Sequence, residues 1–295
     1  MVRLSFVAEV IRLAYWRSVI VARRTTHNLF VQQQKMMATT GGVTKVDNVV
    51  ILPVPESRYK DVLDHVTPIF LRDEPLSHCF PVCTNGQRER DFREYATSQL
   101  QSGLCVTALE PQGEYTGNVD ELIRTGKVVG SCLNRALAIS KIVEDSIQLQ
   151  ITPDTEDVDP LIRSVMRLLT TVHLKLDIFS ALSVDEVLEI GLASVEPTHV
   201  GKGLATKMMR ASLELGAKRG FKVAKADATG IASAKACQRA GMTPIYRLPY
   251  ADYKVDGKVV FGNTGASNSA LQVLAASLQA TPPYVLPLNN FKCKV

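Results

Sequence analysis

The sequence contains little cysteine, and its cysteines form no pattern that would build a disulfide framework or a zinc site. Six cysteines are spread over 295 residues, and only Cys79 and Cys83 lie close together, without a second such pair. We therefore expect reduced, mostly buried thiols and no bound metal. The chain also lacks any run approaching the ~18 uninterrupted apolar residues of a membrane-spanning helix. We expect a soluble protein without a membrane span.

The chain has little net charge once its first 45 residues are set aside. These carry seven basic and one acidic side chain, or +6, which leaves −1 for the rest of a chain whose total is +5. A nucleic-acid-binding domain carries its excess cations on the folded part, as a patch that neutralises phosphates. The near-neutral remainder argues against nucleic acid as the main partner. With 46% apolar residues, we expect one domain over 46–295 with a short C-terminal tail.

The basic leader, residues 1–45, needs a separate interpretation. Apolar residues and arginines alternate at helical spacing and acids are scarce, which is typical of a mitochondrial presequence. An interfacial amphipathic helix, a disordered extension and a misassigned start codon are the competing interpretations. The predicted localisation is cytoplasmic, or mitochondrial if the leader is a presequence.

From residue 46, short predicted strands alternate with helices, which indicates an α/β fold. Strands are expected at 49–54, 104–109, 127–133, 187–195, 220–226 and 243–248, and the strands at 104–109 and 127–133 should be neighbours. Helices are expected at 56–67, ended by Pro68, at 157–182, which would be the longest, from about 206 to 219, and at 233–240.

A glycine-rich turn, Val200–Thr206, joins the predicted strand 187–195 to the next helix. Glycines let a backbone approach a ligand closely and the N–H groups at a helix N-terminus face it, so this layout suits a phosphate. Leu204 follows Gly203 where a Walker loop has Lys-Ser/Thr, and the third glycine of a dinucleotide fingerprint is missing. A purely structural role for the glycines is the alternative.

The segment Val195–Ala205 resembles the pyrophosphate-binding segment of the GNAT acetyltransferase superfamily, Arg/Gln-x-x-Gly-x-Gly/Ala after a strand with a bulge. Its first position departs from the pattern, but backbone amides hold most of the diphosphate in that superfamily, so binding should be weakened rather than lost. Phe70–Ser77, Ala228–Ser233 and Tyr250–Lys254 resemble, in order and spacing, motifs of the invertebrate arylalkylamine N-acetyltransferases, which include the dopamine N-acetyltransferases. The resemblance covers roughly residues 49–275.

The resemblance implies a GNAT fold: a central mixed β-sheet, splayed near Val195 at the notch for acetyl-CoA, with helices on both faces. Acetyl-CoA would be the co-substrate. Backbone atoms of Ala193 and Val195 would bond its pantetheine arm, and Lys202 would add a point charge near its diphosphate. The implied coenzyme-binding residues are Ala193, Val195, Gly201, Lys202, Gly203, Leu204, Ala205 and Thr206.

An amine acetyltransferase needs a base, because an alkylamine stays protonated up to a pH near 10.4 and its lone pair is then blocked. The resemblance implies Glu74 for this role, a solvated loop acid being the alternative. It also implies Thr229 and Ser233 in proton transfer and substrate placement, with a helix N-cap as the alternative role of Ser233. A backbone N–H at the strand bulge near Val195 would hold the oxyanion.

The predicted activity is direct transfer of the acetyl group from acetyl-CoA to the primary amine of an arylalkylamine, in the class of dopamine, serotonin, tyramine and octopamine. Acetylation of polyamine or protein amines is the alternative within the same chemistry. A catalytically idle acyl-CoA-binding protein is the alternative outside it, and Glu74 argues against that reading because a pure binder needs no base. We expect a monomer acting on a small-molecule amine.

Overall fold

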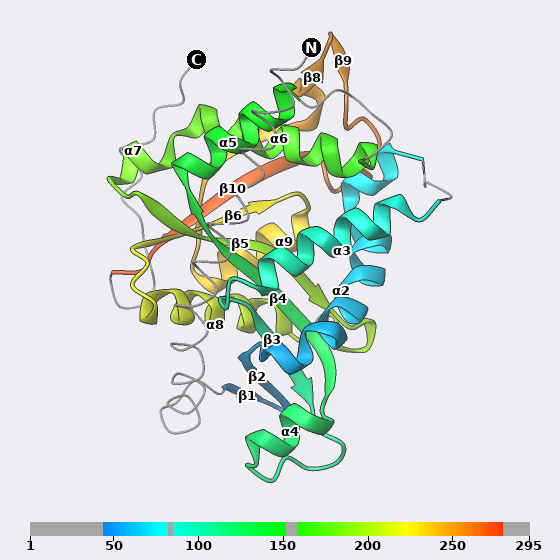
Figure 1. Ribbon diagram of the computed structural model, residues 1–295, viewed down its shortest axis with the longest axis vertical. Coiled ribbons are helices and arrows are strands. Elements are labelled where there is room, and N and C mark those ends of the chain that lie inside the picture. Colours follow the sequence, from blue (N-terminus) through cyan, green and yellow to red (C-terminus); the bar gives the residue numbers. More distant parts are fainter. Residues whose placement is uncertain (1–43, 82–84, 152–157, 280–295) are drawn as a thin grey trace, which may run out of the picture. The chain divides into compact units, whose positions relative to one another are not determined.

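The computed structural model describes residues 44–81, 85–151 and 158–279, so the leader lies outside the described part apart from its last two positions. An eight-stranded sheet in the order β1-β2-β3-β4-β5-β6-β10-β7 forms the centre (Figure 1). Its strands are β1 (Thr44–Val46), β2 (Val49–Pro53), β3 (Val106–Glu110), β4 (Lys127–Ala138), β5 (Glu186–Val195), β6 (Val223–Ala228), β7 (Thr243–Pro249) and β10 (Ala270–Ser277). Only β5 and β6 pair in parallel; every other pair in the sheet is antiparallel.

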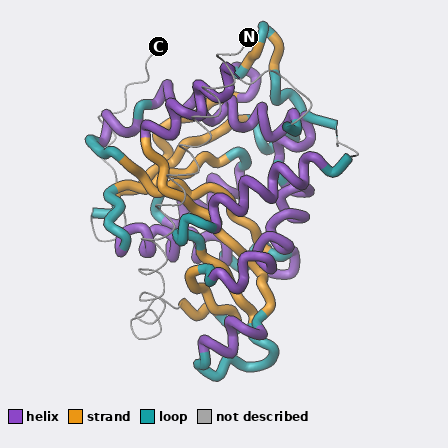
Figure 2. Tube along the Cα trace, in the orientation of Figure 1, coloured by secondary structure: helices purple, strands orange, loops and turns teal. Residues whose placement is uncertain are grey.

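Helices cover both faces of this mixed sheet (Figures 1 and 2). They are α2 (Tyr59–Asp73), α3 (Gln87–Leu100), α4 (Val119–Thr125), α5 (Ile139–Ile151), α6 (Pro160–Leu176), α7 (Ile178–Leu182), α8 (Leu204–Lys218) and α9 (Ile231–Ala240). Short 3₁₀ turns are η1 (Glu56–Arg58), η2 (Pro75–Cys79), η3 (Pro197–His199) and η4 (Tyr250–Asp252), and β8 (Lys254–Val255) pairs with β9 (Lys258–Val259) as a separate hairpin. The predicted α/β class and mixed sheet are confirmed, as is the pairing of β3 with β4.

Two predicted helix boundaries are wrong. Helix α2 does not end before Pro68 but continues through it to Asp73. A proline removes one backbone hydrogen bond, and the apolar face buried on both sides of it, with Val62 and Ile69, holds the helix together. The predicted helix 157–182 is broken at Asp177, whose φ of 43° ends α6 and whose carboxylate accepts a hydrogen bond from Ser180 N–H at the start of α7.

Strand β10 lies between β6 and β7, although its residues read only as one apolar patch in the C-terminal tail. Nearly the whole strand is buried, including Leu271, Val273 and Leu274. A strand covered on both faces loses the alternation of apolar and polar residues that marks a half-exposed strand. The tail of the predicted domain therefore completes the sheet.

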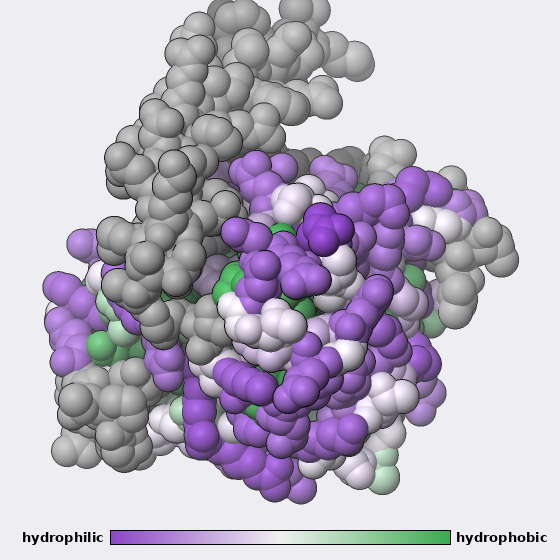
Figure 3. All heavy atoms as spheres, turned by 90° about the horizontal axis from the view of Figure 1, so that it is seen from below, coloured by the Kyte–Doolittle hydropathy of each residue, from purple (hydrophilic) through white to green (hydrophobic). Residues whose placement is uncertain are grey.

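The surface around α4, at the lower end of Figure 1, is mostly hydrophilic (Figure 3). Within the described ranges, no helix has both the length and the apolar character that crossing a bilayer requires.

Removing residues 1–43 tests the leader, and we choose this boundary because β1 begins at Thr44, inside the predicted segment 1–45. If the leader is a targeting segment outside the fold, the melting temperature and the rate at which CoA thiol is released from acetyl-CoA should stay nearly unchanged, and a fluorescent fusion should move from mitochondria to cytosol. A cytosolic full-length fusion would contradict targeting. A destabilised truncation would contradict a leader outside the fold.

Candidate active site

The notch in the sheet opens at Gly191, between β5 and β6. These strands pair only where Leu188–Ile190 faces Ala224–Ala226. The register of β5 against β4 shifts at this point, so that Leu192 and Ile190 face neighbouring residues of β4 and Gly191 is the extra residue. A Cβ on Gly191 would lie 2.9 Å from Gln99 Oε1, which explains the glycine. The bulge and splay were predicted near Val195, and the structure has them four residues earlier, at Gly191.

Beyond the bulge, one edge of β5 faces the notch. Glu196 N–H bonds Val129 O of β4 at 2.9 Å, and backbone groups along a strand alternate between its two edges. The N–H groups of Ala193 and Val195 are therefore directed away from β4, on the side where β6 no longer pairs. This geometry suits the strand-like bonding of a pantetheine arm predicted for these two residues.

The glycine-rich turn presents an open helix N-terminus. Gly201 and Gly203 have φ values of 83° and 76°, a region that side-chain-bearing residues rarely adopt. A Cβ on either would meet no heavy atom within 4 Å, and Gly203 caps the 15-residue helix α8 without a side-chain bond. The first N–H groups of α8, those of Leu204, Ala205 and Thr206, have no acceptor within the helix, and together with the helix dipole they suit an anion.

Glu74 lies where α2 ends and η2 begins, rather than in a free loop. Its Oε1 accepts a hydrogen bond from Leu76 N–H at 3.2 Å, and its Oε2 accepts one from Thr229 Oγ1 at 3.0 Å. Burial raises the pKa of the carboxyl to about 7, against the smaller opposite effect of these two donors. The structure therefore brings together two predicted residues that are 155 positions apart, and gives the acid a pKa suited to proton transfer near neutral pH.

The hydroxyl of Ser233 bonds the N-cap residue of its own helix. Ser233 is the third residue of α9, and its Oγ donates to Gly230 O at 2.9 Å. The N-cap of α9 is Gly230, so the alternative role of Ser233 as an N-cap is wrong. Its predicted part in proton transfer stays a prediction.

Tyr250 holds the backbone of Thr229 in place, a role that was not predicted from the sequence. Its hydroxyl donates to the backbone oxygen of Thr229 at 2.7 Å. The side chain is 2% exposed, in a core with Leu76 and Phe261. Thr229 is thereby held at the end of β6 that faces Glu74.

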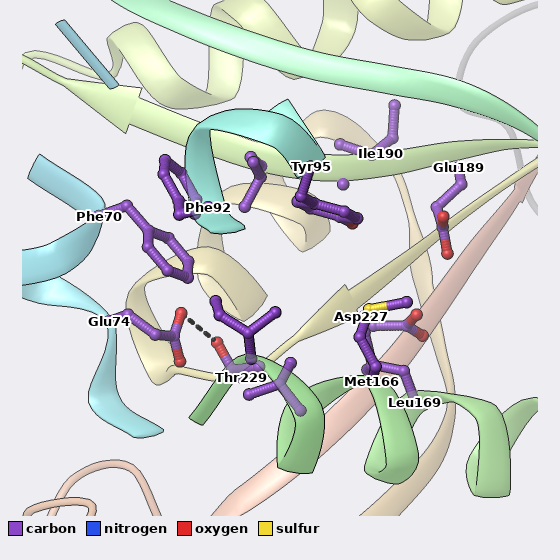
Figure 4. Close-up of a pocket in the computed structure, with 14 residues that line it drawn as sticks. Phe70, Glu74, Phe92, Tyr95, Met166, Leu169, Glu189, Ile190, Asp227 and Thr229 are labelled. Carbon is purple, nitrogen blue, oxygen red and sulfur yellow. Dashed lines mark hydrogen bonds between the residues drawn. The ribbon is translucent and has the colours of Figure 1, made fainter. Parts of the chain in front are cut away.

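A pocket that is open to solvent extends from Glu74 along the diverging strands (Figure 4). Its wall is largely aromatic and aliphatic. Phe70 and Phe92 stack with centroids 4.1 Å apart and planes 12° apart, and Tyr95, Met166 and Leu169 continue the wall. Such a surface suits a flat apolar group.

A buried cluster of charged side chains forms the far wall of the pocket. None of these residues was predicted from the sequence as part of the site. Lys225 Nζ lies 2.7 Å from Glu189 Oε1, 2.5 Å from Asp227 Oδ2 and 2.7 Å from His173 Nε2. Arg135 Nε donates to Glu189 Oε2. Burial alone would raise the pKa values of both acids, but the neighbouring cations outweigh it: the pKa of Glu189 falls to about 2 and that of Asp227 lies well below its usual range.

The cluster also contains a histidine and two acids at metal-ligand spacing, His173, Glu189 and Asp227. The ammonium of Lys225 contacts all three, so a cation of the chain's own already occupies the centre of the group. These residues therefore do not fit a metal ion, and the expectation that none is bound stays a prediction.

Solved amine acetyltransferases have folds similar to this chain. Arylalkylamine N-acetyltransferase 2 from Aedes aegypti has a TM-score of 0.67 and 26% identity, over 79% of this chain and 100% of that one. A Drosophila melanogaster polyamine N-acetyltransferase that forms N-acetylagmatine has a TM-score of 0.64 and 19% identity, over 78% and 99% of the two chains. No protein-family model matches the sequence. The predicted GNAT fold and the resemblance to the arylalkylamine enzymes are confirmed.

Proposed function

We propose that this chain, an N-acetyltransferase of the GNAT superfamily, moves the acetyl group of acetyl-CoA to the primary amine of an arylalkylamine. The observation that carries the proposal is the Glu74–Thr229 pair at one end of an aromatic pocket, beside the notch between β5 and β6. A base, an aromatic site and an open phosphate-binding turn are the three parts that this reaction needs.

Glu74 supplies the base. With a pKa of about 7, its carboxylate is populated at neutral pH and yet basic enough to take a proton from a bound ammonium as the nitrogen attacks. Leu76 N–H and Thr229 Oγ1 hold the two carboxylate oxygens in place. The aromatic wall, including Phe70, receives the ring of the substrate.

Acetyl-CoA supplies the thioester whose carbonyl carbon the amine attacks. The diphosphate would lie on the turn from Gly201 to Thr206, and the pantetheine arm along Ala193 and Val195. The new C–N bond forms, the C–S bond breaks, and the departing thiolate takes up a proton, for which Ser233 is the candidate donor. The backbone at the Gly191 bulge, rather than near Val195, is the candidate for binding the oxyanion.

A panel of amines incubated with acetyl-CoA, followed by release of free thiol, tests the proposal. We expect turnover with phenylethylamines and indoleethylamines. Turnover confined to polyamines or to peptide amines would establish the alternative acetyltransferase. No turnover, together with a stabilising shift by acetyl-CoA, would establish an idle acyl-CoA-binding protein.

Replacing Thr229 with valine should move the acidic limb of the pH–rate profile upward by about one pH unit. The hydroxyl donates to the carboxylate of Glu74 and so lowers its pKa; losing a hydrogen bond to a charged group costs about 1.5 kcal/mol, which corresponds to about one unit. Thr229→Ser keeps the donor and should keep the limb near 7. A valine variant with an unmoved limb would show that Thr229 does not tune the base.

A further inference from the structure

Thr229 lies in the short crossing, residues 229–231, that leads from β6 into α9, so the position of its hydroxyl depends on how this crossing is held. Tyr250 holds one end of it, through the backbone oxygen of Thr229. At the other end, Ile231 N–H has no acceptor within the helix that it begins, and it donates to Asn268 Oδ1 at 3.0 Å. The crossing is therefore held at both ends.

The contact with Asn268 takes the place of an ordinary helix cap. Such a cap comes from the side chain of the helix's own N-cap residue, but the N-cap of α9 is Gly230, which has no side chain. The acceptor comes instead from 37 positions further along the chain. The cap therefore also ties the crossing to the loop that precedes β10.

Asn268 is itself held by its own loop. Its backbone N–H donates to Gly265 O at 3.0 Å, and its Nδ2 donates to Thr264 O at 3.3 Å. With the amide nitrogen bonded to the loop, the amide oxygen is left for α9. The backbone oxygen of the next residue, Ser269, accepts a hydrogen bond from Tyr250 N–H at 3.0 Å. The two supports of the crossing are thus anchored to each other.

The base is packed directly against this crossing. A Cβ on Gly230 would lie 3.1 Å from Pro75 Cγ and 3.2 Å from Asn268 Oδ1, and Pro75 is the residue that follows Glu74. The φ of Gly230 is −131°, which any residue adopts, so the glycine is needed for space and not for its backbone angle. The segment that carries the base and the side chain that holds the crossing therefore meet at one glycine.

We infer that Asn268 is a positioning residue of the active site: it holds the crossing beside Pro75 and thereby keeps Thr229 Oγ1 on the carboxylate of Glu74. The inference rests on the proposed function. It adds a residue that acts through Thr229 rather than on the substrate.

Most other titratable groups on the elements around Glu74 keep one charge state between pH 6 and 8. Burial raises the pKa values of the neutral ones, and ion pairs hold the charged ones. These groups are Cys79 of η2, Tyr250 of η4, Asp73 and Arg72 of α2, and Asp227 and Lys225 of β6. Two histidines are of a type that can titrate in this range: His78, exposed in η2, and His173 of α6, in the charged cluster.

The variant Asn268→Ala tests the inference through the pH dependence of kcat/KM, measured by thiol release with the best amine of the panel. Without Oδ1 the crossing is free to move, and Thr229 donates less to Glu74. This donor lowers the pKa of Glu74, so the acidic limb should move upward by about half a unit to one unit, no further than in Thr229→Val. The rate at pH 6 should fall about 3- to 10-fold, and the rate at high pH should change much less.

The double variant Asn268→Ala/Thr229→Val separates positioning from a general effect on the fold. Without the hydroxyl, Asn268 has nothing left to position, so the limb should lie where it lies in Thr229→Val alone. Two shifts that add up would overturn the inference, because Asn268 would then act by another route.

Asn118→Ala is the matched control. Asn118 caps α4 as Asn268 caps α9, since its Oδ1 accepts a hydrogen bond from Glu121 N–H at 3.1 Å, but α4 lies at the lower end of Figure 1. This variant should lose a comparable amount of stability and keep the wild-type limb. His78→Gln should also keep it, which excludes that histidine as the source of the limb.

Gly230→Ala perturbs the same contact and decides the question if Asn268→Ala does not fold. The added Cβ would displace Pro75 or Asn268, so the limb should again move upward. A limb that stays in place in the folded variant, while Thr229→Val moves it, would overturn this inference alone. An unmoved limb in Thr229→Val would overturn it together with the role of Thr229. No turnover with any amine would overturn the proposed function and this inference with it.

Discussion

Replacing Glu74 with glutamine is expected to lower kcat by ~10²–10⁴-fold. Glutamine keeps the size of the side chain. Its amide oxygen can accept the hydrogen bond from Leu76 N–H and its amide N–H₂ can donate to Thr229 Oγ1, but it cannot take a proton from the ammonium. Binding of acetyl-CoA should change by a small factor only, because the turn before α8 is a separate part of the site. Steady-state thiol release and a coenzyme titration measure the two effects.

Asp73→Asn is the matched control for this variant. Asp73 adjoins Glu74, but its carboxylate is exposed and forms a bidentate ion pair with Arg72, with both N–O distances at 2.6 Å. Its removal should leave kcat within about twofold. Full activity of the Glu74→Gln protein at neutral pH would exclude Glu74 as the base.

The second large effect is expected at the coenzyme turn. Gly203→Val should abolish the rise in melting temperature that acetyl-CoA causes by mass action. The branched side chain would project into the open space before the α8 N-terminus, where a Cβ meets no atom within 4 Å, and would block the approach of the diphosphate. The positive φ of 76° adds a strain of about 1–2 kcal/mol.

Gly220→Val separates blocked binding from that strain. Gly220 follows the other end of the same helix with a φ of 86°, and a Cβ there also meets no atom within 4 Å. This variant should lose a comparable amount of stability and yet keep the full shift with acetyl-CoA. A full shift in Gly203→Val would place the coenzyme elsewhere.

Local patterns in the sequence predicted most of what positions the site. The turn at Gly201 and Gly203 needs glycine because its backbone has positive φ angles, and the two glycines are evident in the sequence. Glu74 and Thr229 were found through motifs of a known family. Their contact joins the residue that follows α2 to the residue that follows β6, and it depends on the tertiary fold rather than on their spacing along the chain.

The features that were not predicted from the sequence depend on tertiary contacts. Helix α3 reads as polar almost throughout, and its apolar face consists of little more than Phe92, Ala96 and Leu100 at intervals of four. The charged cluster did leave a signal: Lys225 and Asp227 alternate within an otherwise apolar strand, and buried charges must be paired. The glycine at the bulge, Gly191, is required by the close approach of Gln99, a tertiary contact that the sequence alone does not reveal.

The most direct test of the account is the pH dependence of kcat/KM for the best amine, with wild-type protein and with Glu74→Gln. Because burial raises the pKa of Glu74 to about 7 and the ionised form is the active one, the wild-type rate should fall about tenfold per unit below pH 7 and level off above it. The glutamine variant should lack this limb and recover in part only at high pH, where free amine brings its own lone pair. A wild-type profile without a limb near 7, or the same limb in both proteins, would contradict the central claim that Glu74 is the base of an amine acetyltransferase.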